Sequence, residues 1–267
     1  MSNIVLNEHD WARDMIERRS LGKKPTETLS RVARYYIDKR YNKRDVRNML
    51  DTFVLQCDPS ASLPKWDKLL DFAVNKASKT QAVMIDKIVI TKPEINRIDA
   101  LDGMPIRRLA FTLLVLAKYW NIVSGTSSFW VNSKDTDIMR MANIKASVKR
   151  QSQMYHALNE AGLVRFSKKV DNTNVQVLFS EDGTAAVDVC DLRNIGYQYM
   201  RYLGGPYFVC QNCGVTEKYD NPEHGKCQKY CRACAIEVRT RQNVNSVMQL
   251  RKEKLNKTAK MLEKQNA

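Results

Sequence analysis

The sequence predicts a mainly α-helical protein with small β-hairpins. Apolar residues recur at three- and four-residue intervals through much of the first 160 residues, as they do on the buried face of a helix. Two short runs, 163–170 and 175–179, alternate apolar and polar residues instead, as paired strands do. Five of the seven cysteines lie within 210–234, which predicts a small C-terminal unit held together by something other than a large core.

The composition favours an anionic partner. The 267 residues are 43% hydrophobic, enough for one large or two modest domains. Lysine and arginine number 44 against 29 acidic residues, a net charge of +15, which indicates nucleic acid first and an acidic membrane surface second. No apolar run is long enough to span a bilayer, and the N-terminus lacks the basic and apolar regions of a secretory signal. We therefore expect no membrane association and a cytoplasmic protein with reduced thiols.

Residues 1–100 are predicted to form a helical N-terminal region. Asn7, Thr26 and Asn42 are placed to cap three amphipathic helices, and a fourth is expected over about 64–77. A short strand is expected within 84–90. Thr91 and Glu94 then have the spacing of a capping box, with a proline in the first turn of another helix. A basic run at 39–44, with Arg47, could contact phosphate, although such runs are more often solvated turns.

Residues 101–204 are predicted to form one domain. An apolar helix covers 106–120, a short strand follows at 129–131, and Ser133 is placed to cap the next helix. A helix over 147–161, closed by Gly162, follows the turn at 143–144. The two alternating runs then make a hairpin joined at 171–174.

The cysteine cluster predicts a structural zinc site within a ribbon at 205–236. Its pattern is C-x2-C-x17-C-x2-C, formed by Cys210, Cys213, Cys231 and Cys234. Each pair places two thiolates on one tight backbone knuckle, and Gly214 suits a knuckle that needs a positive φ. Cys227 or His224 could replace one of the four. A redox role would need a single C-x-x-C in a βαβ context, which the sequence lacks.

The order helix, strand, helix-turn-helix, hairpin over 106–180 resembles the winged helix-turn-helix domains of DNA-binding proteins. With DLRNIGYQYM and the following KYCRACAIEVRTR, the chain also resembles phage and mobile-element proteins of Gram-positive bacteria. The resemblance implies double-stranded DNA as the partner and a bacterial host cytoplasm as the location. It implies that the helix at 147–161 enters the major groove and that the hairpin touches the backbone.

The expected DNA contacts surround that helix. Val148, Met154, Leu158 and Ala161 are expected to be buried, which turns other side chains outward. The candidate DNA-binding residues are Lys145, Lys149, Arg150, Gln153, His156, Arg165, Lys168 and Lys169. Arginine and glutamine suit the edges of guanine and adenine, and lysines near the hairpin tip suit phosphate.

These features predict a non-enzymatic DNA-binding protein with structural zinc, either a transcription regulator or a replication initiation factor of a phage or mobile element. One alternative is a phage protein that binds and modulates host machinery, including host defence. Another is a metal-dependent nuclease using Asp188 and Asp191, since Asp135 and Asp137 suit the first turn of a helix. The basic tail, 237–267, could lie along DNA, form a homodimer, or be a solvated tail.

Overall fold

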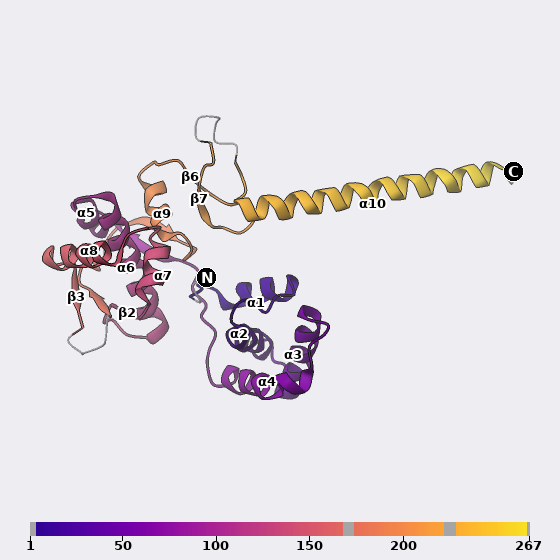
Figure 1. Ribbon diagram of the computed structural model, residues 1–267, viewed down its shortest axis with the longest axis horizontal. Helices are drawn as coiled ribbons and strands as arrows, with labels where there is room; N and C mark the ends of the chain where they lie inside the picture. The colour runs from indigo at the N-terminus through magenta and orange to yellow at the C-terminus, as the bar shows by residue number, and fades with distance from the viewer. Residues whose placement is uncertain (1–3, 168–173, 222–227, 266–267) are drawn as a thin grey trace.

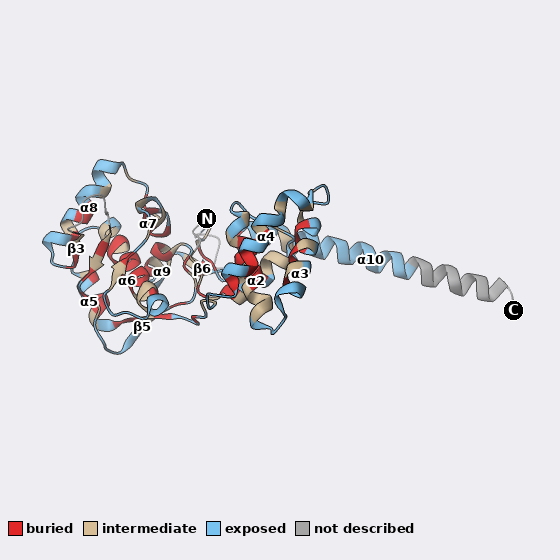
Figure 2. Cartoon of the chain, turned by 90° about the horizontal axis from the view of Figure 1, so that it is seen from below, coloured by how far each residue is buried: buried red, intermediate tan, exposed pale blue. Residues whose placement is uncertain are grey.

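The computed structural model describes residues 4–167, 174–221 and 228–265, with side chains described as far as Glu253 in the last helix. The described part is mainly helical, with small antiparallel sheets (Figure 1). A cluster of four cysteines lies in its C-terminal part. The predicted fold class is confirmed. Figure 2 shows buried residues gathered in two separate groups of elements.

The first group is a bundle of four helices. These are α1 (Glu8–Glu17), α2 (Pro25–Asp38), α3 (Lys43–Cys57) and α4 (Leu63–Ala77). Asn7 and Asn42 cap α1 and α3 as predicted, each accepting a backbone N–H three residues ahead at 2.9 Å. The cap predicted at Thr26 is wrong. Helix α2 begins at Pro25, whose fixed φ and missing N–H suit a first helical position, so Thr26 lies inside the first turn.

The second group is built around one apolar helix and contains the predicted order of helix, strand, two helices and hairpin. Its elements are β1 (Ile88–Thr91), α5 (Lys92–Asp99), α6 (Met104–Ser124), β2 (Trp130–Val131), α7 (Asp135–Met141), α8 (Val148–Glu160), β3 (Val164–Phe166), β4 (Val175–Val177), β5 (Ala185–Val189) and α9 (Ile195–Tyr202). Helices α7 and α8 are the predicted helix-turn-helix. Strands β3 and β4 are the predicted hairpin, and β2 joins them in the order β2-β4-β3.

The three-stranded sheet has one face toward the core and one face away from it. Val131 and Phe166 both pair with Val175, and this row belongs to the core around α6. The neighbouring row points the other way because successive side chains in a strand alternate. That outer row, Trp130, Gln176 and Arg165, crosses all three strands.

Strand β1 and helix α5 also pack against this core. Strand β1 pairs with β5, about a hundred residues further along the chain, and Ile88, Ile95 and Ile98 are buried with α6. The domain boundary predicted at residue 100 therefore falls between two helices that share one core. The capping box of Thr91 and Glu94 is confirmed.

The expected cap at Ser133 is wrong. Helix α7 begins at Asp135 after Lys134, without a side-chain cap. The Ser133 hydroxyl instead accepts a hydrogen bond from the indole N–H of Trp120 at 3.3 Å. Asp135 and Asp137 do lie in the first turn of α7, where the helix dipole favours acidic side chains.

A buried ion pair anchors α5 to α6. Glu94 is fully buried, and its carboxylate accepts hydrogen bonds from the Lys118 ammonium at 2.7 Å and the Thr91 backbone N–H at 2.8 Å. Lys118 also donates to the Val89 carbonyl at 2.8 Å. The pair is thus satisfied by partners from several elements.

Removing one member of this pair should destabilise the fold strongly. We expect Lys118→Met to lower the free energy of unfolding by about 3 kcal/mol, because it leaves a buried carboxylate without its cation. Denaturant titration followed by circular dichroism measures this. The double variant Lys118→Met/Glu94→Gln should recover part of the loss. An equal or larger loss in the double variant would contradict the assignment.

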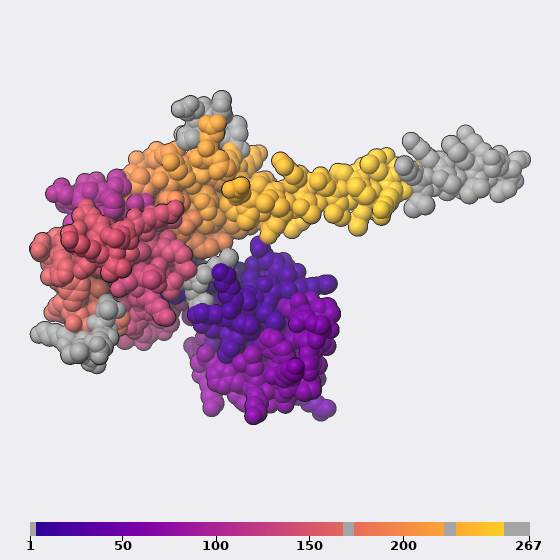
Figure 3. Space-filling view, viewed as in Figure 1, coloured from indigo at the N-terminus to yellow at the C-terminus, as the bar shows by residue number. Residues whose placement is uncertain are grey.

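The C-terminal part consists of a small hairpin and a long helix. Strands β6 (Tyr207–Val209) and β7 (Thr216–Lys218) pair antiparallel, and α10 covers Arg232–Gln265. The helix extends away from the rest of the molecule, and its described side chains are mostly exposed (Figure 3). Near its start, Glu237 contacts Arg18 of α1 at 3.1 Å. None of the described helices is both long and apolar enough to cross a membrane.

Candidate metal centre and nucleic-acid surface

The four paired cysteines come together in space. The sulfur atoms of Cys210, Cys213, Cys231 and Cys234 all lie within 4.8 Å of one another. The Cys213 and Cys231 sulfurs are 3.8 Å apart, and none of the four forms a disulfide. A tetrahedral ion with metal–sulfur bonds of about 2.3 Å requires sulfurs about 3.8 Å apart. The residues therefore fit a four-thiolate metal site, while the alternates Cys227 and His224 lie outside the described residues.

The backbone around the first pair has the predicted knuckle form. Strand β6 leads into Cys210, and Gly214 adopts a φ of 74°, which a residue with a Cβ rarely adopts. The Gly214 N–H donates to the Cys210 carbonyl at 2.9 Å. The second pair lies at the start of α10, so the metal site and the long helix share residues.

The environment lowers the pKa of the Cys210 thiol and raises the pKa of the Cys213 and Cys231 thiols. Burial opposes ionisation of Cys210, but backbone N–H groups of Cys231, Cys213 and Asn212 outweigh it and lower its pKa to about 6. Burial raises the pKa of the Cys213 and Cys231 thiols. A bound cation would favour the thiolate form of all four.

Two asparagines join the cysteine unit to the turn between α7 and α8. Asn194 Nδ2 donates to the Thr216 carbonyl and to the Glu217 carboxylate, both at 3.1 Å, while its Oδ1 accepts from Asn143 Nδ2 at 3.0 Å. Asn143 lies in the turn of the helix-turn-helix. Both asparagines adopt left-handed backbone conformations, which asparagine tolerates better than most residues. Arg193, held by Asp191, donates to the Cys213 carbonyl. The orientation of the ribbon is thereby tied to α7 and α8.

Helix α9 packs so closely against the end of α7 that Gly196 has no space for a side chain. A Cβ at this position would lie 2.0 Å from the carbonyl oxygen of Ala142, at the end of α7. We expect Gly196→Ala to lower the free energy of unfolding by about 1–3 kcal/mol, because α9 must move away from α7. Thermal or denaturant unfolding measures this. Tyr202→Ala, at the exposed end of the same helix, is the control. An unchanged midpoint for Gly196→Ala would contradict the close packing.

Helix α8 presents the predicted polar side chains to solvent. The predicted helix starts at Ser147, but this residue is the N-cap, and its side chain accepts the Arg150 backbone N–H. Lys149, Gln153 and His156 are all exposed, and their spacing of four and three residues places them on one face. Arg150, also exposed, donates to Gln153 at 3.2 Å and so leans over this face. Lys145, before the helix, is exposed as well.

Two of the four residues expected to be buried in α8 are exposed. Val148 is 82% exposed and Ala161 is also exposed, because both lie at helix ends beyond the edge of the core. Met154 and Leu158 are buried as predicted, and Tyr155 joins them. Tyr155 donates from its hydroxyl to Asp135 at 3.2 Å, and burial together with this carboxylate raises its pKa. This hydrogen bond was not predicted from the sequence, and it fixes α8 against the start of α7.

Among the described residues, the hairpin contributes one of the predicted basic DNA contacts, Arg165. Arg165 is exposed on the outer row of the sheet, and its guanidinium donates to Gln176 Oε1 at 2.5 and 3.2 Å. The predicted contacts Lys168 and Lys169 lie outside the described residues. His156 rests against Phe166, with ring centroids 5.4 Å apart, so α8 and the hairpin are in contact.

Other candidate residues are engaged within the protein. Arg47 forms ion pairs with the carboxylates of Asp51, Asp67 and Asp71. Its positive charge is therefore neutralised within the N-terminal bundle. Asp188 pairs with Lys87 at 2.7 Å, and Asp191 pairs with Arg193. Among the described residues, the four cysteines are the only group of three or more His, Cys, Asp or Glu side chains arranged to hold a metal.

A pocket beside the hairpin was not predicted. It has a volume of about 450 Å³ and lies between the end of α6, strand β2 and the hairpin. Two tryptophans, three asparagines, three serines and a threonine line it. We call it the indole pocket, after Trp120 and Trp130. The sequence contained one indication of this pocket. Successive side chains in a strand point to opposite faces, so an inward-facing Val131 places the neighbouring Trp130 on the outer face of the sheet.

No known family model, curated protein or solved structure matches the chain.

Proposed function

We propose that the protein binds duplex DNA, reading the major groove with α8 and contacting the backbone with the hairpin. The observation that carries this proposal is the exposed face of α8, where Lys149, Gln153 and His156 lie together and Arg150 leans across them. In a helix-turn-helix, such a face belongs to the second helix, which lies in the groove.

The chemistry of this face suits base recognition. Lysine and arginine side chains donate hydrogen bonds to guanine edges, and glutamine pairs with adenine. The Lys149, Arg150 and Gln153 side chains are exposed, and none of them forms an ion pair in the described structure. Arg165 stands at the hairpin, where a phosphate contact would set the register without reading sequence. The overall charge of +15 supplies long-range attraction to the polyanion.

We further propose that the cysteine cluster holds zinc in a structural role. Four buried or half-buried thiols with tetrahedral spacing leave no open position for a substrate. When bound, the ion would stabilise a segment whose own core is small, and it would hold the ribbon against Asn194. The role of the whole protein would be regulation of transcription or initiation of replication in a phage or mobile element.

The test is binding of the zinc-loaded chain to random-sequence duplex DNA across a salt series. We expect the logarithm of the association constant to fall linearly with the logarithm of salt concentration, with a slope set by the number of phosphate contacts. Selection of sites from a random pool should then return a preferred sequence. Absence of duplex binding at low salt would overturn the proposal and favour a protein partner instead.

A further inference from the structure

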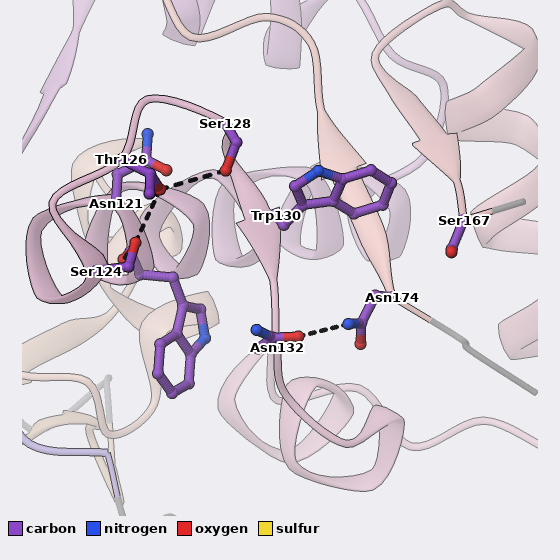
Figure 4. Close-up of a pocket in the computed structure, with 9 residues that line it drawn as sticks. Asn121, Ser124, Thr126, Ser128, Trp130, Asn132, Ser167 and Asn174 are labelled. Carbon is purple, nitrogen blue, oxygen red and sulfur yellow. Dashed lines mark hydrogen bonds between the residues drawn. The ribbon is translucent and has the colours of Figure 1, made fainter. Parts of the chain in front are cut away.

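The indole pocket opens beside the hairpin. Figure 4 shows the Trp130 indole projecting from β2 toward the side where Ser167 lies, with Asn132 and Asn174 hydrogen-bonded to each other below it. The hydroxyls of Ser124, Thr126 and Ser128 gather on the opposite side. The described lining therefore combines indole rings with hydroxyl and amide groups.

The Trp120 indole is held in place by contacts within the protein, and Trp130 is partly buried. Trp120 donates its indole N–H to Ser133 at 3.3 Å and packs edge-to-face against Tyr119, with ring centroids 5.3 Å apart. Trp130 is half-buried on the outer row of the sheet, next to the fully inward Val131. A preorganised ring loses little conformational freedom when a ligand stacks on it.

The polar side chains that line the pocket indicate a neutral ligand that can donate and accept hydrogen bonds. The pocket lining contains no acidic or basic side chain among the described residues. Asn121 uses its oxygen to accept the Phe129 backbone N–H at 2.8 Å, which directs its amide nitrogen elsewhere as a donor. Flat aromatic surfaces combined with amides and hydroxyls suit a planar heterocycle that both donates and accepts. The volume lies in the range of small-ligand sites.

The outer row connects this pocket to a cation. Gln176 donates to the Ser128 carbonyl at 2.9 Å and accepts from Arg165, so one side chain links the pocket rim to the guanidinium. The strands carrying Trp130 and Arg165 are separated by one intervening strand, a spacing of about 9–10 Å. An aromatic pocket and a cation on one face are the combination that proteins use to stack bases and hold phosphates.

We propose that the indole pocket binds an unpaired nucleobase, stacked on Trp130, while Arg165 contacts an adjacent phosphate. This inference rests on the proposed function, since it places the pocket beside the DNA held by α8 and the hairpin. It adds a structural preference: an extrahelical or single-stranded base near the site would be bound in addition to the duplex.

The experiment compares a fully paired duplex with one containing a single unpaired 2-aminopurine, using the zinc-loaded full-length chain. We expect tighter binding of the second duplex and quenching of 2-aminopurine by the indole. Trp130→Ala should abolish this preference, a loss of roughly fivefold or more, because base–aromatic stacking contributes about 1–3 kcal/mol. Its affinity for the paired duplex and its salt slope should not change, because no charge is removed. Trp130→Phe should keep most of the preference.

The control is Phe72→Ala, which removes a half-exposed aromatic side chain from α4 and should change neither affinity. Free adenosine and thymidine form a second arm. Saturable nucleoside binding that depends on Trp130, without preference for the unpaired base in DNA, would overturn the proposed preference for an unpaired base and show that the pocket binds free nucleosides.

Two outcomes separate the inference from the proposed function. If the paired duplex binds but neither the unpaired base nor a nucleoside depends on Trp130, the inference is overturned and DNA binding stands. If no duplex binds yet nucleosides bind through Trp130, the proposed function fails and the pocket remains a nucleobase site. Binding of methyl glucoside in place of nucleosides would overturn the inference and assign the pocket to carbohydrate.

Discussion

Replacing Lys149, Arg150 and Arg165 together by alanine is expected to weaken duplex binding on the order of a hundredfold at physiological salt. Removal of each cation that meets a phosphate should reduce the slope of the logarithmic salt plot by about 0.9, so the loss of Arg165 should make the plot flatter by roughly 1, and the loss of Lys149 and Arg150 from base edges should change the slope less. All three side chains are exposed, and Arg165 bonds only to a neutral glutamine among its described partners. Their removal should therefore leave the fold unchanged, which circular dichroism checks.

The charge-matched control is Lys65→Ala/Lys68→Ala/Lys79→Ala, which removes three exposed lysines on or just after α4. It lowers the net charge equally but leaves the face of α8 intact. If both triple variants weaken binding to the same degree, the overall charge binds DNA and the winged helix has no special role. A selective loss in the first variant locates the contact on α8 and the hairpin.

Replacing Cys231 by serine is expected to abolish stoichiometric metal binding and unfold the ribbon. Structural zinc contributes about 10–16 kcal/mol to the folding of comparably small units, far more than the few buried residues around Phe208 and Val215 can supply. Because α10 begins at Arg232, directly after this ligand, its first turn should fray as well. Metal analysis gives the zinc content, and far-UV circular dichroism gives the helix loss.

The matched control is Cys190→Ser, since Cys190 is exposed and lies outside the cluster. It should keep about one zinc per chain, as a single four-thiolate site requires. Adding a strong chelator to the wild-type chain should reproduce the Cys231→Ser spectrum. A serine variant that retains a full equivalent of zinc and unchanged helicity would show that another residue completes the site.

The local parts of the fold could be predicted from sequence because their causes are local. Asparagine caps, a capping box and the spacing of paired cysteines each act within a few residues. The exposure of Val148 could not be predicted, because an apolar residue in the first turn is buried only if another element reaches it. The position of Ser133 was misjudged for a similar reason, since its hydroxyl bonds to an indole on α6 instead of starting α7.

Features that depend on segments far apart in the chain could not be predicted from the sequence. Arg47 belongs to a basic run in the sequence, but carboxylates from α4 neutralise it in the folded bundle. The indole pocket combines residues from 120–132 with Ser167 and Asn174, which meet only when the hairpin packs beside β2. The junction at Asn194 joins α7, β7 and the loop before α9 through side-chain amides. Each of these needs the tertiary arrangement before its chemistry is visible.

Because α10 starts inside the second cysteine knuckle, the direction of the helix depends on the geometry of the cysteine cluster. With a rise of about 1.5 Å per residue, a helix of 34 residues is about 51 Å long. A rotation of about 10° at its base would carry the far end through about 9 Å, by simple lever geometry on that length. Small changes in the angle between the two cysteine pairs would therefore be amplified into large displacements of the helix tip.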